Sequence, residues 1–257
     1  MRRITLALLF AFFGGVALGA PHDTEPLEND FMNATTLLYG QDESGSMKML
    51  CTATAFEREG KVYHFAAAAH CVSEDDTDHE RVQMHQMSWF ITFDDLKDKN
   101  FVSAKVLGVG YQHRGDDFAV FEVVIEKRAV PIMPLAENPH LGEVIVNIAS
   151  PLGLGKQLFR GHVSMEHLNR PLIQDSINWK GAALLQMSVG PGSSGSAVVS
   201  LRQKGIVAFL VGELSQQRGS PNIVAIPVEK FKKFWTDVKA KKYKWYREED
   251  AESSQKK

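Results

Sequence analysis

The 257-residue sequence has no excess of charge of either sign, only two cysteines, and no apolar run long enough to cross a membrane. Its 29 basic and 31 acidic side chains give a formal net charge of −2. The basic surplus typical of nucleic-acid-binding surfaces is missing, so we expect no nucleic-acid partner. With 44% apolar and 23% charged residues, the composition is that of a globular protein and not of a disordered chain.

The N-terminal segment 1–20 differs in composition from the rest of the chain. Two arginines precede an uncharged run at residues 4–18, which is shorter than the roughly 20 residues that a membrane-spanning helix needs. A positive start, a short apolar run and small residues after it are typical of a secretory signal peptide. We therefore expect cleavage after Gly19 or Ala20 and a secreted or periplasmic protein. The alternative is an uncleaved N-terminal anchor.

Cys51 and Cys71 form the only possible cysteine pair. In an oxidising compartment two such cysteines are expected to form a disulfide, and closing a loop of this size contributes roughly 3 kcal/mol to stability. The alternative is two buried free thiols. His70 directly precedes the second cysteine.

The rest of the chain contains short runs rich in β-branched and aromatic residues, separated by turn residues. This pattern predicts an all-β barrel or sandwich. Near the C-terminus, apolar residues recur at intervals of three or four between Val228 and Val238, which predicts one helix. The predicted strands are 49–57, 62–66, 82–93, 104–111, 118–125, 143–149, 157–165, 184–189, 196–201, 205–214 and 222–228.

Three segments carry the residue types of nucleophilic catalysis, in the order histidine, aspartate, serine. His70 ends a run of alanines, Asp116 and Asp117 open an apolar strand, and Ser194 lies in a glycine-framed segment. A serine nucleophile needs a base, the base needs an orienting acid, and the tetrahedral intermediate needs backbone N–H donors. Each segment alone is more often structural. Their joint occurrence in an exported, β-rich chain predicts a hydrolytic site.

These segments resemble the motifs of the trypsin-like, double-barrel serine peptidases. The matching segments are 68–71 (Ala-Ala-His-Cys), 117–120 (Asp-x-Ala-hydrophobic) and 192–196 (Gly-x-Ser-Gly-Gly/Ser). Residues 149–155 and 224–228 are similar to the bacterial HtrA-type branch. The resemblance covers about residues 35–235 and implies a chymotrypsin-like fold, all-β, with two six-stranded antiparallel barrels and a C-terminal helix.

The resemblance also implies domain boundaries. The peptidase domain is expected at 21–246, with the first barrel at about 30–135, the second at about 136–228 and the helix at about 228–246. A charged tail is expected at 247–257. The peptide-binding module that HtrA-type enzymes usually append is not expected.

By this resemblance Ser194 attacks the carbonyl carbon, His70 takes and returns the proton, and Asp117 orients His70. The N–H groups of Gly192 and Ser194 form the oxyanion hole. Asp117 is preferred over Asp116 because it occupies the motif position.

Two departures from the family pattern bear on activity. Ser193 stands where digestive members carry an aspartate that pairs with a newly cut N-terminus, so activation by that cut is not expected. Leu210 stands where many members carry a serine that supports the catalytic aspartate. The intact His70, Asp117 and Ser194 nevertheless favour a serine endopeptidase. Leu210 and Ser193 leave open the alternative of a catalytically impaired homologue that acts as a binding or chaperone-like module.

The resemblance places Ser188 at the base of the first substrate pocket, Gly212 and Asn222 on its walls and Phe209 nearby. Ser188 offers no charge partner for arginine or lysine. Phe209 replaces the histidine that glutamyl endopeptidases use. We therefore expect a protein or peptide substrate with an uncharged residue of small to medium size before the scissile bond.

No cofactor and no metal are expected. The acidic segment 73–80 lacks the ligand spacing of a calcium hand and is predicted to be a solvated surface loop. The lysine-rich C-terminal helix has an aromatic face, so contact with an anionic membrane is an alternative. We expect this helix to pack on the second barrel instead. The oligomeric state is not predicted.

Overall fold

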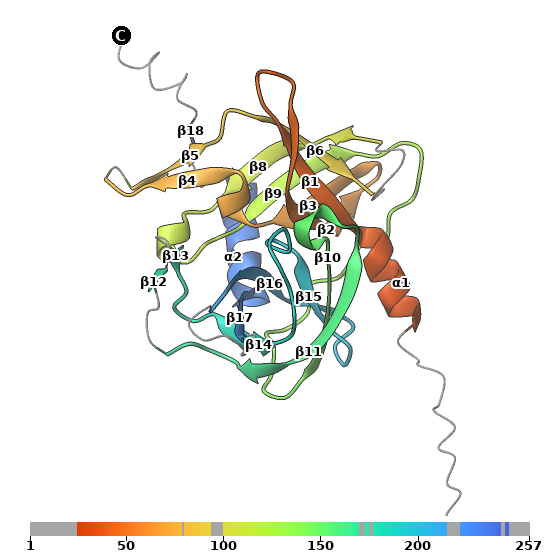
Figure 1. Cartoon of the computed structure of the whole chain (residues 1–257), viewed down its shortest axis with the longest axis vertical. Helices are drawn as coiled ribbons and strands as arrows, with labels where there is room; N and C mark the ends of the chain where they lie inside the picture. Colours follow the sequence, from red (N-terminus) through yellow and green to blue (C-terminus); the bar gives the residue numbers. More distant parts are fainter. Residues whose placement is uncertain are drawn as a thin grey trace, which may run out of the picture.

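The computed structural model describes residues 25–78, 80–93, 100–169, 173–174, 177–214, 222–242 and 245–246. Its strands form two barrels that lie against each other, with one helix beside them and a second behind their junction (Figure 1). The expected signal peptide 1–20 and tail 247–257 lie outside the described residues. Among the residues that are described, no helix combines the length and apolarity needed to cross a bilayer.

The first barrel closes through one bent chain segment. Its strand order is β7 (Val102–Ser103), β6 (Ser88–Thr92), β1 (Thr35–Gln41), β2 (Met47–Glu59), β3 (Val62–Ala67), β9 (Ala119–Val124) and β8 (Lys105–Val109). The edge strands β7 and β8 are consecutive in the chain and are separated only by Ala104. This segment pairs antiparallel with β6 through its first half and with β9 through its second half. Counted as one strand, it completes a six-stranded barrel.

The second barrel is a closed antiparallel sheet of six strands. Its order is β10 (Val144–Ala149), β11 (Gln157–Met165), β14 (Ala183–Gln186), β17 (Asn222–Pro227), β16 (Gly205–Glu213) and β15 (Ala197–Ser200), which pairs again with β10. Closure leaves no unpaired sheet edge. The predicted all-β, two-barrel, chymotrypsin-like fold is confirmed.

Two predictions around residues 73–93 need correction. The predicted run 82–93 is two strands, β5 (Arg81–Met84) and β6, because the chain turns at His85 and Met87 to bond with Val72 and with itself. The acidic segment predicted as a surface loop begins with a strand, β4 (Ser73–Asp76), which pairs antiparallel with β5.

The helices also differ from prediction at their ends. α1 (Glu25–Ala34) was not predicted; it has two glutamates in its first turn, where the helix dipole favours negative charge, and it buries Phe31. α2 (Val228–Lys239) ends earlier than the expected residue 246. Lys241 adopts a φ of 56°, which a right-handed helix cannot continue through.

Further short strands of the described chain lie outside the barrels. The segment β18 (Trp245–Tyr246) pairs in parallel with β5. The short strands β12 (Ile173–Gln174) and β13 (Ile177–Asn178) pair with each other.

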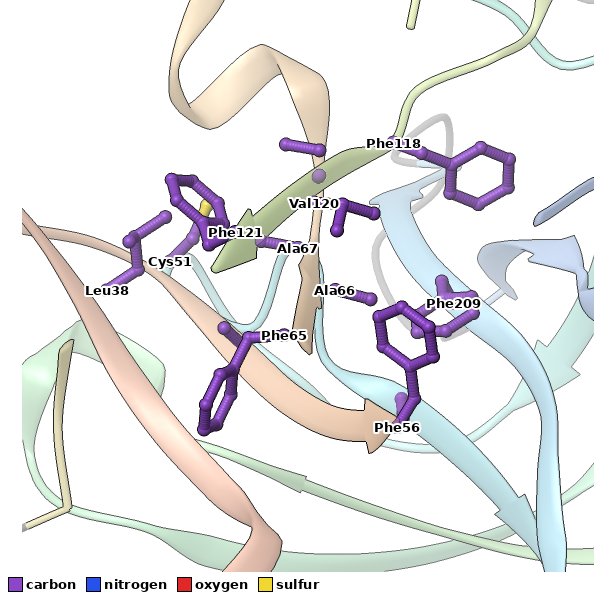
Figure 2. Close-up of a cluster of buried hydrophobic side chains, with 14 of the residues drawn as sticks. Leu38, Cys51, Phe56, Phe65, Ala66, Ala67, Phe118, Val120, Phe121 and Phe209 are labelled. Carbon is purple, nitrogen blue, oxygen red and sulfur yellow. The ribbon is translucent and has the colours of Figure 1, made fainter. Parts of the chain in front are cut away.

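α2 packs on both barrels, and not on the second barrel alone. The ring of Phe231 lies 4.9 Å from Phe56 of β2, 5.3 Å from Phe118 and 4.5 Å from Phe209 of β16. Figure 2 shows Phe56, Phe118 and Phe209 within the buried cluster between the barrels. Aromatic pairs of this kind contribute about 0.5–1.5 kcal/mol each beyond area burial. Because Phe118 belongs to this cluster, its chain neighbour Asp117 is held at the barrel junction.

Candidate active site

His70 lies in the 3-10 helix η1 (Ala69–Cys71), directly after β3. The alanines at 66–69 are all buried, and their small side chains let the end of β3 approach the second barrel closely. The disulfide Cys51–Cys71 joins η1 to β2, with a Cα–Cα distance of 6.2 Å that is usual for such bonds. The expected disulfide is therefore present, and it fixes the chain on the C-terminal side of His70.

Asp117 holds His70 by two contacts. The carboxylate lies just before β9 and is fully buried. The backbone N–H of His70 donates to Oδ1 at 2.9 Å, and the ring Nδ1 lies 2.6 Å from Oδ2. In the neutral imidazole this contact favours the proton on Nδ1, which leaves Nε2 free to act as a base.

The electrostatics of the pair favour proton uptake by His70. Burial disfavours the charged imidazolium and acts to lower its pKa. The charge of Asp117 and its hydrogen bond to the ring outweigh burial, so the pKa of His70 is raised above the ordinary value of 6.5. A raised pKa makes the imidazole a stronger base toward a serine hydroxyl.

Ser194 and His70 line the same pocket. This pocket has a volume of about 400 Å³, and its other lining residues are Lys48, Met49, Leu50, Cys51, Cys71, His85 and Met87. Gly195, with a φ of +79°, lets the chain turn immediately after Ser194; a Cβ there would lie 2.8 Å from the Ala67 Cα. The carbonyl of Ser194 accepts the N–H of Thr52, which fixes the serine against β2.

The N–H groups of the turn at residues 192–196 differ in their hydrogen bonding. Among the described residues, the N–H groups of Gly192 and Ser194 have no hydrogen-bond acceptor, whereas those of Ser193, Gly195 and Ser196 bond to carbonyls. Gly192 has a φ of +96°, a conformation that favours glycine. Two unpaired N–H donors beside a serine are the arrangement that an oxyanion requires.

The structure separates the neighbouring candidates for each role. Ser193 is fully buried, and its hydroxyl accepts the N–H of Gly190 at 3.4 Å. Asp116 accepts the N–H of Phe118 through its carbonyl, and its charge acts on Lys230. Asp117, and not Asp116, contacts His70.

Three of the four residues expected around the substrate pocket retain some exposure. Ser188 is exposed, and Gly212 and Asn222 are half-buried. A Cβ at Gly212 would lie 2.9 Å from Cζ2 of the buried Trp179, so this indole occupies the space beside Gly212.

Phe209, expected near the substrate pocket, is buried, and so is Leu210. Phe209 is 1% exposed, because its ring packs between Phe118 and Phe231, so it offers no surface to a substrate. The side chain of Leu210 packs inside the second barrel. Among the described residues, both hydrogen bonds to the Asp117 carboxylate come from His70.

Asp75 is a supporting residue that the sequence did not reveal. Its carboxylate accepts the N–H groups of Gln112 at 3.2 Å and of His113 at 2.6 Å, in the 3-10 helix η2 (Gln112–Arg114). Burial raises the pKa of Asp75 despite these two hydrogen bonds. In the sequence this residue is hidden in an acidic cluster, and only the folded chain shows that it anchors the turn before Asp117.

The one grouping of metal-ligating residue types within the described part of the chain is Cys51, His70 and Cys71. Its two sulfurs are joined in the disulfide, so they are not available as thiolate ligands.

Comparison with known proteins identifies the family of this chain. A profile of the trypsin-like peptidase domain family matches residues 51–208. The serine protease HtrA-like of Staphylococcus aureus strain USA300 is 28% identical over 216 residues, which cover 78% of this chain and 24% of that protein. The protein of the same name from strain bovine RF122 / ET3-1 is 27% identical over the same length. The chain thus spans about a quarter of these relatives.

Solved structures share the fold. The HtrA-type protease AlgW with a tripeptide superposes with a TM-score of 0.62 at 18% identity, over 83% of this chain and 62% of that one. A serine-to-alanine variant of AlgW, also with a tripeptide, gives a TM-score of 0.61. The matched range includes His70, Asp117 and Ser194; in the structure His70 contacts Asp117 and lines one pocket with Ser194. The chain therefore belongs to the trypsin-like peptidase family.

Proposed function

We propose that this protein is an exported serine endopeptidase that cleaves peptide bonds through an acyl-enzyme at Ser194. The observation that carries the proposal is the double contact of His70 with the buried Asp117, in a histidine that lines one pocket with Ser194. This combination gives a serine a base and gives the base an orienting acid.

In the proposed mechanism, Nε2 of His70 takes the Ser194 hydroxyl proton as Oγ bonds to the substrate carbonyl carbon. The carbonyl oxygen becomes an oxyanion held by the N–H groups of Gly192 and Ser194. His70 then gives its proton to the leaving amine, and the C–N bond breaks. Water, deprotonated by the same imidazole, then attacks the acyl carbon. The bond from this carbon to Ser194 Oγ breaks, His70 returns the proton to Oγ, and the acid product leaves. Asp117 keeps its charge and stabilises the imidazolium.

The proposed preference is for an uncharged, small to medium residue before the scissile bond. Ser188 is exposed and uncharged, so it offers no partner to a cationic side chain. The indole of Trp179 against Gly212 limits the space at that wall. Profiling with a peptide library tests this preference: cleavage after alanine, valine or serine is expected, and dominant cleavage after arginine or glutamate would contradict it.

Export is proposed from the composition of residues 1–20 and is consistent with the disulfide. Protein disulfides persist mainly in oxidising compartments. Expression of the full chain in a bacterium, with fractionation and N-terminal sequencing, tests this. A mature chain that starts at residue 20 or 21 and lies outside the cytoplasm is expected; full-length protein in the cytoplasm would contradict export.

A second candidate is a catalytically impaired homologue that binds unfolded segments. It is favoured by one observation: within the described chain, the Asp117 carboxylate has no donor besides His70, and Leu210 offers no hydroxyl. Turnover of a peptide by the wild-type protein, absent in a Ser194→Ala variant, distinguishes the enzyme from this alternative.

A further inference from the structure

The direction of each oxyanion N–H is set by the carbonyl of the same peptide group. In a planar trans peptide the C=O and N–H point in opposite directions. The N–H of Gly192 shares its peptide group with the Pro191 carbonyl, and the N–H of Ser194 shares one with the Ser193 carbonyl. Whatever binds those two carbonyls therefore aims the two donors.

The Ser193 carbonyl is held by Ser196. Its oxygen accepts the Ser196 N–H at 3.1 Å and the Ser196 hydroxyl at 2.6 Å. The oxygen of that hydroxyl in turn accepts a hydrogen bond from Nδ2 of Asn147 at 2.7 Å. Both Ser196 and Asn147 are fully buried. Because Asn147 donates to the serine oxygen, the single hydroxyl proton of Ser196 is directed at the Ser193 carbonyl.

The Pro191 carbonyl is held by the loop at residues 150–155. Its oxygen accepts the N–H of Leu152 at 2.7 Å. Leu152 has a φ of 54°, an unfavourable conformation for leucine that persists only when its surroundings enforce it. A Cβ on Gly192 would lie 2.9 Å from the Ser150 carbonyl, so loop and turn are in close contact.

Thr52 joins this loop to the turn. Its side chain is fully buried in β2 of the first barrel. The hydroxyl donates to the Gly192 carbonyl at 2.9 Å and accepts the Ser150 N–H at 3.2 Å. The backbone N–H of Thr52 donates to the Ser194 carbonyl at 3.1 Å. Thr52 thus bonds to Ser150 at the start of the loop, to Gly192 and to Ser194.

We propose that Thr52 and Ser196 are positioning residues for the oxyanion hole and that they act through their buried hydroxyls. Thr52 fixes the Gly192 carbonyl and the loop that aims the Gly192 N–H, and Ser196 aims the Ser194 N–H. Neither side chain reaches the pocket or the reacting atoms. The inference rests on the proposed function, since it assigns these hydroxyls a role in that same peptidase site.

The test compares Thr52→Val, which keeps the shape and removes the hydroxyl, with Thr52→Ser, which keeps the hydroxyl. Removing one oxyanion donor outright lowers kcat by about 10²–10³, so a misdirected donor should cost at least about 10-fold. We expect Thr52→Val to lose at least that much kcat with little change in KM, and Thr52→Ser to retain most of it. Ser196→Ala should behave like Thr52→Val.

A second readout separates positioning from general damage. The His70–Asp117 contact does not involve these hydroxyls, so the pH at which kcat/KM is half-maximal should stay at the wild-type value in Thr52→Val and Ser196→Ala. A shift of that midpoint would overturn the proposal. If Thr52→Val does not fold, the pair Thr52→Ser and Thr52→Ala replaces it, because these two variants differ from each other by one oxygen atom.

The outcomes separate the two proposals. If the wild-type protein hydrolyses no peptide and its serine does not react, the proposed function fails and the inference fails with it. If the wild type is active and Thr52→Val is as fast as Thr52→Ser, only the inference fails. Loss of kcat in Thr52→Val and its recovery in Thr52→Ser would support it.

Discussion

One carboxylate, that of Asp117, bonds both the backbone and the ring of His70, one through each oxygen. The hydrogen bond to the backbone N–H fixes the position of the His70 backbone, and the contact with Nδ1 fixes the orientation of its imidazole ring. The fully buried Asp117 therefore determines both the position and the tautomer of the base.

Asp117→Asn is expected to abolish most activity. The amide can donate to Nδ1, which moves the ring proton to Nε2 and removes the base; in triads of this type the loss in kcat is about 10⁴. Asp116→Asn is the matched control, because Asp116 does not contact His70 and should keep near wild-type kcat. Equal losses in both variants, measured on one peptide substrate, would contradict the assignment.

The pH dependence of catalysis follows from the raised pKa of His70. Since only the neutral imidazole acts as a base, kcat/KM should rise with pH along a limb centred above 6.5. The imidazolium–carboxylate pair also stabilises the fold fully below 6.5, and this contribution is lost as the pH rises through the raised pKa. NMR titration of the His70 ring checks the value directly. In Asp117→Asn the pKa should fall, because burial then acts without the opposing charge; an unchanged pKa would refute this explanation.

The disulfide should stabilise the first barrel. It closes a loop of 20 residues, for which the chain-entropy model gives about 3 kcal/mol. Chemical denaturation of wild type and of Cys51→Ala/Cys71→Ala measures the difference. Reductant should lower the wild-type midpoint toward that of the variant and leave the variant unchanged. Identical midpoints of the oxidised wild type and the variant would show that the bond adds no stability.

The contacts of α2 should stabilise both barrels together. Phe231 is fully buried against Phe56, Phe118 and Phe209, and truncation of such a side chain costs about 3–5 kcal/mol. Phe231→Ala should therefore lower the free energy of unfolding by that amount. Lys233→Ala on the same helix is the control; its side chain is 79% exposed and should change stability by less than about 0.5 kcal/mol. A near-neutral Phe231→Ala would mean that α2 is not part of the core.

Alternating and β-branched runs predicted most of the strands. This works because a strand that buries one face carries apolar residues in a periodic pattern that is visible in its own short segment of sequence. β11 spans the predicted residues 157–165, and β3 extends the predicted run by one residue. β4 was missed because Ser73 and Asp75 are polar, and their burial depends on partners 37 to 39 residues away in η2. Such distant partners leave no periodic pattern in the sequence.

The residues of the sequence motifs were predicted, but the residues whose role depends on distant partners were not. The motif around His70, Asp117 and Ser194 is local in sequence, and the structure brings the first two together by direct contact. Phe209 was expected near substrate, but α2 covers it, and the sequence did not show on which side of β16 the helix would lie. Thr52 was not singled out, because its partners Ser150 and Gly192 lie 98 and 140 residues further along the chain.

The most direct test of the central claim is reaction of the purified mature protein with a fluorophosphonate, followed by mass spectrometry of the labelled peptide. The proposed site predicts one adduct, on Ser194 and not on the neighbouring Ser193, and none in Ser194→Ala. It also predicts that labelling slows strongly in Asp117→Asn. A folded wild-type protein that takes no label, or that is labelled equally well in Ser194→Ala, would contradict the claim that this chain contains an activated serine.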